Sequence, residues 1–242
     1  MEFSVDILDI EGRAFGLSEL KDFAAVSTGD LIPDPDAQNI KASQVPMMTA
    51  RRLSQGSRHA VDIGLILSRR NDIDGVVYSS MSGEIVHNLN VLISSAKGEA
   101  CSPTDFSMSV HNSAVGNFTI LSKSKIPSSS VSSGRDSFFM ALLEAYSMLE
   151  SNEMKKIMVV DFDVNIPDFF KNFLPADFPC YPYAAGVVVE KGTGVHFKGE
   201  HITSSDKKSG CPASISFLTH YAAGSSFRHE GELFSWQVDI KA

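Results

Sequence analysis

Apolar residues along the chain fall into alternating and clustered patterns that predict strands and helices in turn. Phe3, Val5 and Ile7 alternate with polar neighbours, which is the period-two pattern of a half-buried strand. Short apolar runs bounded by turn residues predict further strands at residues 75–79, 156–161, 184–190 and 195–197. Weaker patterns near the C-terminus predict two closing strands at residues 217–221 and 233–240.

Helices are predicted where apolar residues recur three or four positions apart. The segments 47–67, 85–96 and 104–121 have this spacing, and a further helix follows a Ser/Gly turn near residue 134. Strands that alternate with helices predict a layered α/β fold with buried, largely parallel strands. We expect one domain over residues 1–242, with a tail of uncertain structure over 199–242.

Composition narrows the range of partners and compartments. The net charge of −8 argues against binding to nucleic acid or to an anionic membrane surface, which both need clustered Lys and Arg. No apolar run is long enough for a membrane span, and the acidic start does not have the pattern of a signal peptide. Three widely spaced cysteines (Cys101, Cys180 and Cys211) favour a reducing cytoplasm over a disulfide framework.

The most informative stretch is IPSSSVSSGRDSFFMALLEAY, residues 126–146. It predicts a short strand, a tight turn, and then a helix that is apolar on nearly every side. Many acyl-transfer enzymes hold a nucleophile at such an elbow. The helix dipole and the free N–H groups there stabilise a thiolate or an oxyanion.

This stretch resembles the nucleophile elbow of the β-ketoacyl synthases, which are thiolase-fold enzymes. Their pattern is a small residue, Cys, a small residue, Ser or Gly, then Gly, and often Asp two residues on. Laid on residues 130–136, the pattern puts Val131 at the position of the catalytic Cys, within an elbow of Ser130, Ser132, Ser133 and Gly134. Because valine cannot form a thioester, the resemblance implies the setting of the active site without its nucleophile.

Three other places carry the resemblance, which spans roughly residues 5–190. MTARRLS (48–54) resembles the start of the family's first long helix, and the runs KIMVVDFD and AAGVVVE resemble the strands that close its first half. The most specific is SPTDFSMSVHNSAVGNFTI (102–120), with Ser-Val-His-Asn inside a predicted small-residue helix. It is similar to a segment of short ketosynthase-like proteins of the N-terminal-domain type, which include chain length factors of aryl polyene synthesis.

The second half of a complete condensing enzyme supplies two catalytic histidines, in His-Gly-Thr-Gly and Gly-His-x-x-Gly motifs. Neither motif is present in this chain, where the late histidines are His196, His201, His220 and His229. The resemblance therefore implies a thiolase-like layered fold whose first half is complete and whose second half is truncated or missing. It also implies that the chain does not catalyse condensation, and it implies no cofactor.

A role as a partner subunit follows from the resemblance. In the family, the region matched by residues 102–121 lies at the dimer interface and lines the far end of the partner's acyl tunnel. Large side chains there are candidates to bound the tunnel, namely Phe106, Met108, His111, Asn112 and Phe118. The alternative for each of them is that it fills this chain's own core. We expect a chain length factor that forms a heterodimer with a Cys-bearing ketosynthase in type II polyene or fatty-acid-like synthesis, with an acyl carrier protein engaged through that partner.

Other functions leave weaker traces. Ser130 or Ser132 would serve a Ser-dependent acyl hydrolase, but no general base stands at motif spacing, and small hydroxyl residues also suit a tight turn and a helix cap. Asp161 and Asp163 end a strand as in haloacid-dehalogenase-like phosphatases, although Asn165 occupies the place of the expected Thr or Val. The histidines and cysteines have no metal-ligand spacing. A scaffold without a gauging role is the third possibility.

Overall fold

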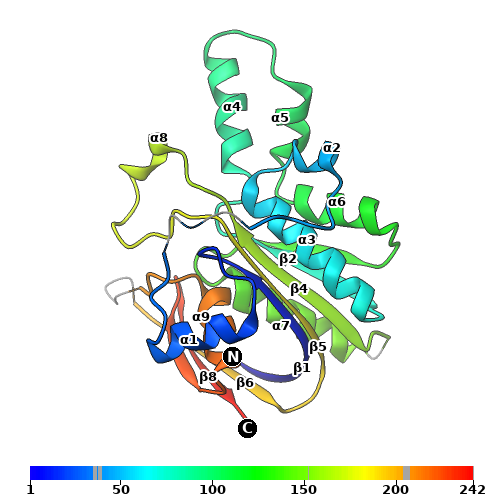
Figure 1. The fold of residues 1–242 in the computed structure, drawn as a ribbon, viewed down its shortest axis with the longest axis vertical. Coiled ribbons are helices and arrows are strands. Elements are labelled where there is room, and N and C mark those ends of the chain that lie inside the picture. Colours follow the sequence, from blue (N-terminus) through cyan, green and yellow to red (C-terminus); the bar gives the residue numbers. More distant parts are fainter. Residues whose placement is uncertain (35–36, 38–39, 152, 204–207, 242) are drawn as a thin grey trace.

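An eight-stranded sheet runs through the computed structural model, which describes residues 1–34, 37, 40–151, 153–203 and 208–241 (Figure 1). The strands are ordered β3-β2-β4-β5-β1-β6-β8-β7 across the sheet. Their bounds are β1 (Glu2–Arg13), β2 (Gly75–Ser79), β3 (Ser128–Val131), β4 (Lys156–Asp163), β5 (Tyr183–Lys191), β6 (Val195–His201), β7 (Phe227–Glu230) and β8 (Phe234–Ile240). The strands predicted before residue 200 are all present, and the layered α/β class is confirmed.

The prediction of largely parallel strands is wrong. Only the pairs β2–β3 and β2–β4 are parallel, whereas the five other pairs of the sheet are antiparallel. Helices connect β2 to β3 and β3 to β4, as parallel pairing requires. The apolar runs of β4 and β5 reflect burial on both faces of the sheet, and that burial does not depend on strand direction.

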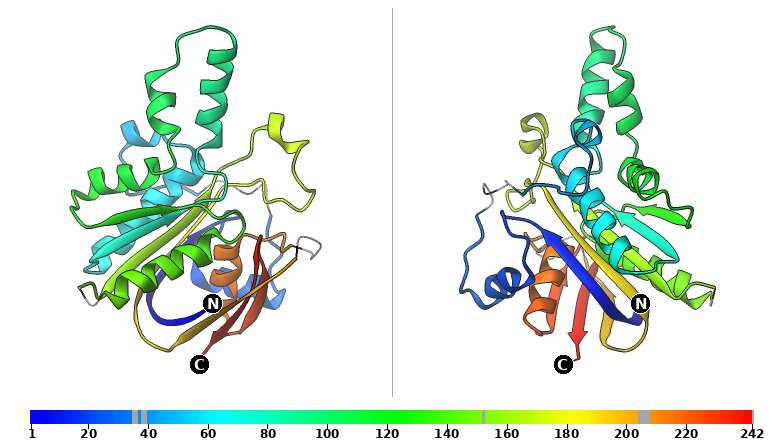
Figure 2. Two further views of the ribbon diagram at one scale, coloured as in Figure 1. Left: turned by 180° about the vertical axis from the view of Figure 1, so that it is seen from behind. Right: turned by 45° about the vertical axis from the view of Figure 1, so that its right-hand side comes forward.

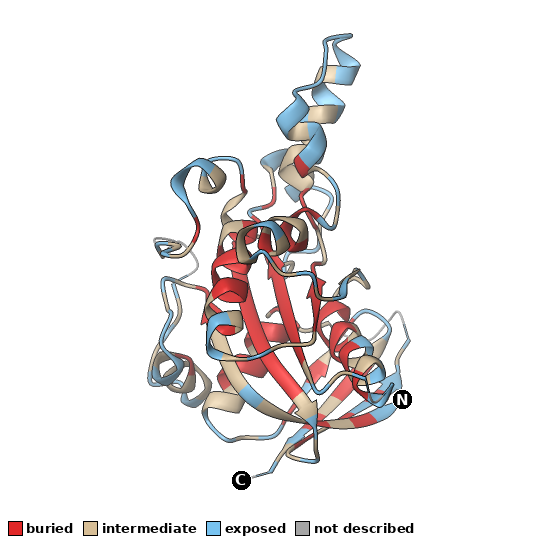
Figure 3. Ribbon diagram, turned by 90° about the vertical axis from the view of Figure 1, so that its right-hand side faces the viewer, coloured by how far each residue is buried: buried red, intermediate tan, exposed pale blue. Residues whose placement is uncertain are grey.

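Helices cover both faces of the sheet (Figures 1 and 2). One buried cluster joins α3 and α6 to the sheet and includes Leu67, Phe118 and Val160. A second joins α7 and α9 to the opposite face and includes Phe139 and Trp236. A third, smaller cluster includes Phe23 of α1 and Leu218 of α9. Figure 3 shows the buried residues concentrated in the central strands and the helices against them. The helices are α1 (Leu20–Thr28), α2 (Met47–Ala50), α3 (Gln55–Arg70), α4 (Ile85–Ala96), α5 (Pro103–Met108), α6 (Ser113–Ser122), α7 (Ser137–Glu150), α8 (Asp168–Lys171) and α9 (Ala213–Ala222).

Two helices predicted as continuous are each divided. The segment 47–67 contains α2 and α3, because the Ser54 hydroxyl accepts the Ser57 N–H at 3.3 Å and starts a new helix. The segment 104–121 contains α5 and α6, so the prediction that Ser-Val-His-Asn lies inside one helix is wrong. These four residues, Ser109 to Asn112, form the connection between the two helices.

The tail from residue 199 belongs to the same sheet. Apart from residues 204–207 and 242, which lie outside the described residues, it contains the end of β6, then α9, β7 and β8. The predicted strand at 217–221 is wrong, because Phe217, Leu218 and Tyr221 lie on α9, where their spacing suits a helix packed against the sheet. The predicted strand at 233–240 is confirmed as β8.

The α4–α5 hairpin, residues 85–108, projects from the body of the molecule (Figures 1 and 2). The predicted helix at 85–96 is present as α4, but none of its residues is buried. Leu92 is 61% exposed and Phe106 on α5 is 66% exposed. The hairpin therefore offers apolar side chains to solvent that the sequence pattern alone assigns to a core.

Candidate elbow site at the start of helix α7

The strand–turn–helix arrangement predicted at residues 126–146 is present. β3 ends at Val131, and the turn closes through bonds from the Asp136 N–H to the Ser133 carbonyl and from the Ser137 N–H to the Gly134 carbonyl, at 3.1 and 3.2 Å. Gly134 has a φ of +56°, a left-handed conformation that glycine adopts without strain. The Ser137 hydroxyl donates to the Gly134 carbonyl at 2.6 Å and accepts the Ser133 N–H at 2.9 Å. The sequence therefore builds the elbow that a nucleophile would need.

Val131 gives this elbow no reactive group. Its side chain is partly buried and packs against the cluster that contains Phe138, Leu142 and the other core residues of α7. An isopropyl group cannot attack a carbonyl carbon and cannot be deprotonated. The residue that the resemblance matches to the catalytic Cys is therefore a packing residue in this structure.

The serines of the elbow have no partner that would activate them. The Ser130 hydroxyl is buried without a hydrogen bond, and Ser132 is exposed. In the part of the chain that the structure describes, neither hydroxyl is hydrogen-bonded to a His, Asp or Glu side chain. A Ser-dependent hydrolase needs such a base, so the geometry gives this alternative no support.

A buried carboxylate pair lies beside the elbow at the end of β4. Asp161 accepts the hydroxyls of Ser79 and Ser214, each at 2.6 Å. Asp163 accepts the Ser80 hydroxyl at 2.8 Å, the Ser82 N–H at 2.8 Å and the Tyr183 hydroxyl at 3.0 Å. Both side chains are almost fully buried, so a phosphatase that presents these carboxylates to a substrate is not supported.

Burial dominates the protonation of this pair. It raises the pKa of Asp161 to about 7, with a further contribution from the charge of Asp163, against the lowering effect of the hydroxyl donors. Burial likewise raises the pKa of Asp163 to about 6. Each hydroxyl group of this network already donates its hydrogen bond to one of the two carboxylates, so none has a donor left for a substrate.

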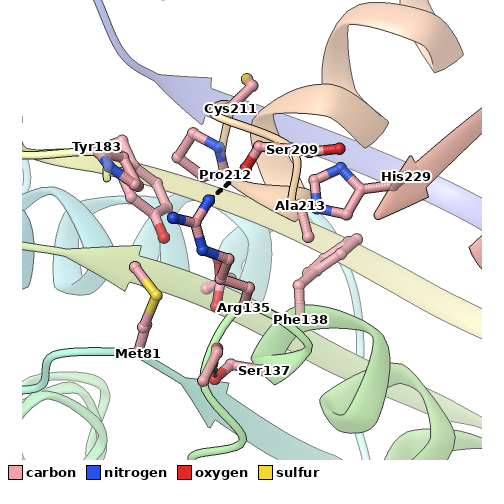
Figure 4. A pocket seen from close by; sticks show the side chains of 13 residues that line it. Met81, Arg135, Ser137, Phe138, Tyr183, Ser209, Cys211, Pro212, Ala213 and His229 are labelled. Carbon is pink, nitrogen blue, oxygen red and sulfur yellow. Dashed lines mark hydrogen bonds between the residues drawn. The ribbon is translucent and has the colours of Figure 1, made fainter. Parts of the chain in front are cut away.

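A small pocket opens at the start of α7, between the elbow and the C-terminal part of the chain (Figure 4). Arg135, Ser137 and Phe138 line it from the elbow, and Pro212 and His229 line it from the C-terminal part. Water-sized molecules can occupy only about 20 Å³ of it, which is room for a single water. An acyl chain cannot enter this pocket without a rearrangement of its walls.

The candidate interface residues of segment 102–120 are placed in different surroundings. Phe106 and Asn112 are exposed, and His111 is half-buried, with its Nε2 3.4 Å from the Ser80 carbonyl oxygen. Met108 and Phe118 belong to the buried cluster under α3, and Phe118 has no exposed surface. For Phe118 the alternative interpretation is therefore confirmed, because its side chain fills this chain's own core.

The α4–α5 hairpin is held by polar contacts along its length and at its base. Asp105 bonds with His87 Nδ1 at 2.8 Å and accepts the Asn90 amide at 3.2 Å. The His87 and Asn90 bonds lower the pKa of the Asp105 carboxyl. At the base, the buried Glu84 carboxylate accepts the hydroxyls of Ser57 and Ser113, which join the hairpin to α3 and α6.

The sequence did not identify the partners of Arg135 and Asp136. Arg135 Nη1 donates to the Ser209 carbonyl at 2.5 Å, and the guanidinium lies over the Phe178 ring with 5.5 Å from its carbon to the centroid. Asp136 accepts the Trp236 indole N–H at 2.8 Å. The family pattern of an Asp shortly after Gly marked Asp136, but nothing in the sequence indicated residues 209 and 236 as its surroundings.

Neither a metal site nor a membrane span emerges from the described ranges. No group of three or more His, Cys, Asp or Glu side chains among them could hold a metal ion. None of the helices within these residues combines the length and the hydropathy of a membrane-spanning segment.

Comparisons with known proteins agree with the fold. A chain of the complex described as "Ketosynthase (ApeO) in Complex with its Chain Length Factor (ApeC)" from Xenorhabdus doucetiae is 40% identical, with a TM-score of 0.91 over 98% of this chain and 99% of that one. "The ishigamide ketosynthase/chain length factor" is 13% identical, with a TM-score of 0.76 over 99% and 100% of the two chains. A β-ketoacyl synthase from Burkholderia phymatum is 13% identical, with a TM-score of 0.61 over 92% of this chain and 71% of that one.

The likeness below 25% identity shows the fold alone, and in the Burkholderia phymatum protein it leaves part of the longer chain unmatched, as expected for a truncated second half. Among curated proteins, none matches this chain. The sequence profile of the family described as "Beta-ketoacyl synthase, N-terminal domain" matches residues 27–237. The chain therefore belongs to the β-ketoacyl synthase N-terminal-domain family.

Proposed function

We propose that this chain is a non-catalytic ketosynthase-like subunit, a chain length factor, that pairs with a Cys-bearing ketosynthase. The observation that carries the proposal is Val131 in an otherwise complete elbow. The strand, the turn and the buried helix are present, and Val131 packs against the core at the position that the resemblance matches to the reacting side chain. The 40% identity to a chain of a ketosynthase–chain length factor complex supports the same role.

The surroundings of the elbow support a role without catalysis. Its pocket has room for one water and not for an acyl chain, and the walls that close it are core and loop residues of this chain. Neither family motif that supplies a catalytic histidine is present. Condensation would then occur on the partner, with the acyl carrier protein engaged there.

The edge of the sheet suits the partner's approach. β3 is the first strand of the sheet order and pairs with β2 alone, so its outer edge has unpaired backbone groups within the part of the chain described. Open edges pair readily with strands of other chains. Ile120 on α6, the helix that precedes β3 in the chain, is 74% exposed and offers further apolar surface.

The tunnel-bounding role rests on the link between α5 and α6. Phe106 and His111 retain accessible surface there, whereas Met108 and Phe118 are held in the core. We therefore assign the contact with the partner's tunnel first to Phe106 and His111. Product length would follow from the space that these side chains leave to the growing chain.

Co-expression with a ketosynthase that has an intact Cys and both histidines tests the proposal. We expect the two chains to co-purify and condensation to require only the partner's Cys. Obligate interfaces bury on the order of 2,000–5,000 Å² in total, so the chain without its partner should be much less stable. A well-folded monomer that leaves the synthase unbound and its products unchanged would contradict the proposal. Replacement of Ser130 and Ser132 by Ala should leave all of these properties intact, and esterase activity lost in these variants would indicate the hydrolase instead.

A further inference from the structure

The pocket at the start of α7 has features that the proposed subunit role does not use. It lies at the N-terminus of a 14-residue helix, where unpaired N–H groups and the helix dipole favour negative charge. Phe138 lines the pocket, and its backbone N–H has no acceptor among the described residues. A helix end of this kind is incomplete without a partner for its donors.

Arg135 brings a full positive charge into the same pocket. Its side chain is only 7% exposed and lies over the Phe178 ring, and its two polar contacts are the Ser209 carbonyl and, at 3.4 Å, the half-exposed carboxylate of Asp177. A guanidinium has five N–H donors, so these two contacts leave donors available. Figure 4 shows the guanidinium near Tyr183 and bonded to Ser209, with His229 on the other side of the pocket.

His229 is the second observation that points to a ligand. It is 2% exposed, lines the pocket, and makes no hydrogen bond with the described residues, its contact being the ring of Phe139 at 5.7 Å between centroids. Burial and then the charge of Arg135 lower the pKa of His229 to about 4, so its ring is neutral and has one N–H to donate.

One carboxylate in the pocket wall would repel an anion, but protonation reduces its negative charge. Asp161 lines the wall, where it accepts the hydroxyls of Ser79 and Ser214. Since burial raises the pKa of Asp161 to about 7, this side chain is largely protonated in mildly acidic solution. The Arg135 charge therefore dominates the pocket there.

We infer that this pocket binds a single monatomic anion of the size of chloride, held by the Arg135 guanidinium, the His229 ring and the N-terminus of α7. The space of about 20 Å³ admits one such ion. Carboxylate and phosphate groups are larger than the single water that this space holds, so they do not fit. The inference goes beyond the proposed subunit role and does not depend on it.

Bromide tests the inference directly, because it replaces chloride and scatters anomalously. In crystals of the full chain, alone or with its partner, soaked in bromide, we expect an anomalous peak between Arg135, His229 and the Phe138 N–H. Bromide bound only at the outer surface, or a water without anomalous signal in the pocket, would overturn the inference.

Thermal unfolding in potassium chloride and potassium gluconate at equal ionic strength gives an independent measurement. Once the chloride concentration exceeds the dissociation constant, each further tenfold rise in chloride should raise Tm by roughly 3–6 °C. Arg135→Gln should abolish this dependence on chloride. Arg228→Gln is the matched control, because Arg228 is exposed and pairs with Glu230 outside the pocket. An equal chloride dependence in both variants would contradict the assignment.

Discussion

The indole N–H of Trp236 donates a hydrogen bond of 2.8 Å to Oδ1 of Asp136, which joins the C-terminal strand β8 to the first residue before helix α7. Oδ2 of the same carboxylate accepts the N–H groups of Glu232 and Leu233 at 3.0 and 2.7 Å. One donor from the buried Trp236 and two backbone donors from the exposed residues Glu232 and Leu233 thus meet on one side chain. Residues 232–236 therefore fix the start of α7 through this one carboxylate.

Replacement of Asp136 by Ala should destabilise the fold by about 3 kcal/mol, because it leaves these three donors without an acceptor. Chemical denaturation of the natural chain and the variant measures this difference. Asp239→Ala on the same strand is the control, since Asp239 is exposed and accepts only the Gln237 side chain. Equal losses in the two variants would show that Asp136 does not join the elbow to the tail.

Two helical glycines should respond to alanine in opposite directions. A Cβ at Gly56 would lie 1.9 Å from the Asp163 carbonyl oxygen, whereas a Cβ at Gly116 would have no atom within 4 Å. We expect Gly56→Ala to cost about 2 kcal/mol through forced displacement of the backbone, and Gly116→Ala to gain about 0.5–1 kcal/mol through helix propensity. Denaturation midpoints measure both.

Gly116→Ala also probes the proposed interface. If a partner helix approaches the small residues of α6 closely, the variant that is more stable alone should bind the ketosynthase more weakly. A stabilised variant with unchanged affinity would place the partner's contact away from Gly116.

The Asp161–Asp163 pair predicts a loss of stability as pH rises. The pKa of Asp161 is about 7 in the folded chain against 3.8 for the free side chain, so its protonated form is favoured by folding. The contribution of Asp161 to the free energy of unfolding is fully present below pH 3.8. It is lost between pH 3.8 and pH 7, at up to about 1.4 kcal/mol per pH unit. Asp161→Asn should therefore gain stability relative to the natural chain across this interval.

Unfolding free energies of both proteins at pH 5 and pH 7.5 measure this effect, and their difference removes the contributions of other groups. Asp74→Asn is a control with the opposite sign. The backbone N–H groups of Lys155 and Lys156 lower the pKa of Asp74, so its removal should cost stability at neutral pH. If the unfolding free energy of Asp161→Asn falls relative to that of the natural chain as pH rises, the carboxylate pair is not protonated as we describe.

Local signals in the sequence were sufficient for most strands and for the elbow. The alternation around Phe3, the apolar run at 156–161 and the Ser/Gly turn before Phe138 each depend on neighbours in the chain, and each is present in the structure. The strand directions were not predictable in the same way. Strands β4 and β5 have apolar runs because helices cover both faces, and that burial is the same for parallel and antiparallel pairs.

Capping and long-range contacts explain what the sequence analysis missed. The hydroxyl of Ser54 divides a periodic segment that otherwise predicts one helix. Position 131 could be interpreted from the sequence because the family pattern assigns a single side chain to it. The pocket could not be predicted from the sequence, because Arg135 and His229 are separated by almost a hundred residues and are brought together only by the sheet.

Exposed Phe106 gives the sharpest test of a length-gauging role. Its side chain is 66% exposed, so Phe106→Ala should change the unfolding free energy by less than about 0.5 kcal/mol. Phe118→Ala, in contrast, would remove a fully buried ring and lower the unfolding free energy by about 3–5 kcal/mol. Any change in products with that variant could then come from an unfolded subunit instead of a wider tunnel. We therefore expect Phe106→Ala to bind the ketosynthase and to lengthen its products. Phe173→Ala is the matched control, because Phe173 is 78% exposed near α8, outside the α5–α6 segment. Products of unchanged length from an intact complex with Phe106→Ala would show that this side chain does not bound the tunnel, and would favour a subunit that stabilises its partner without measuring the chain.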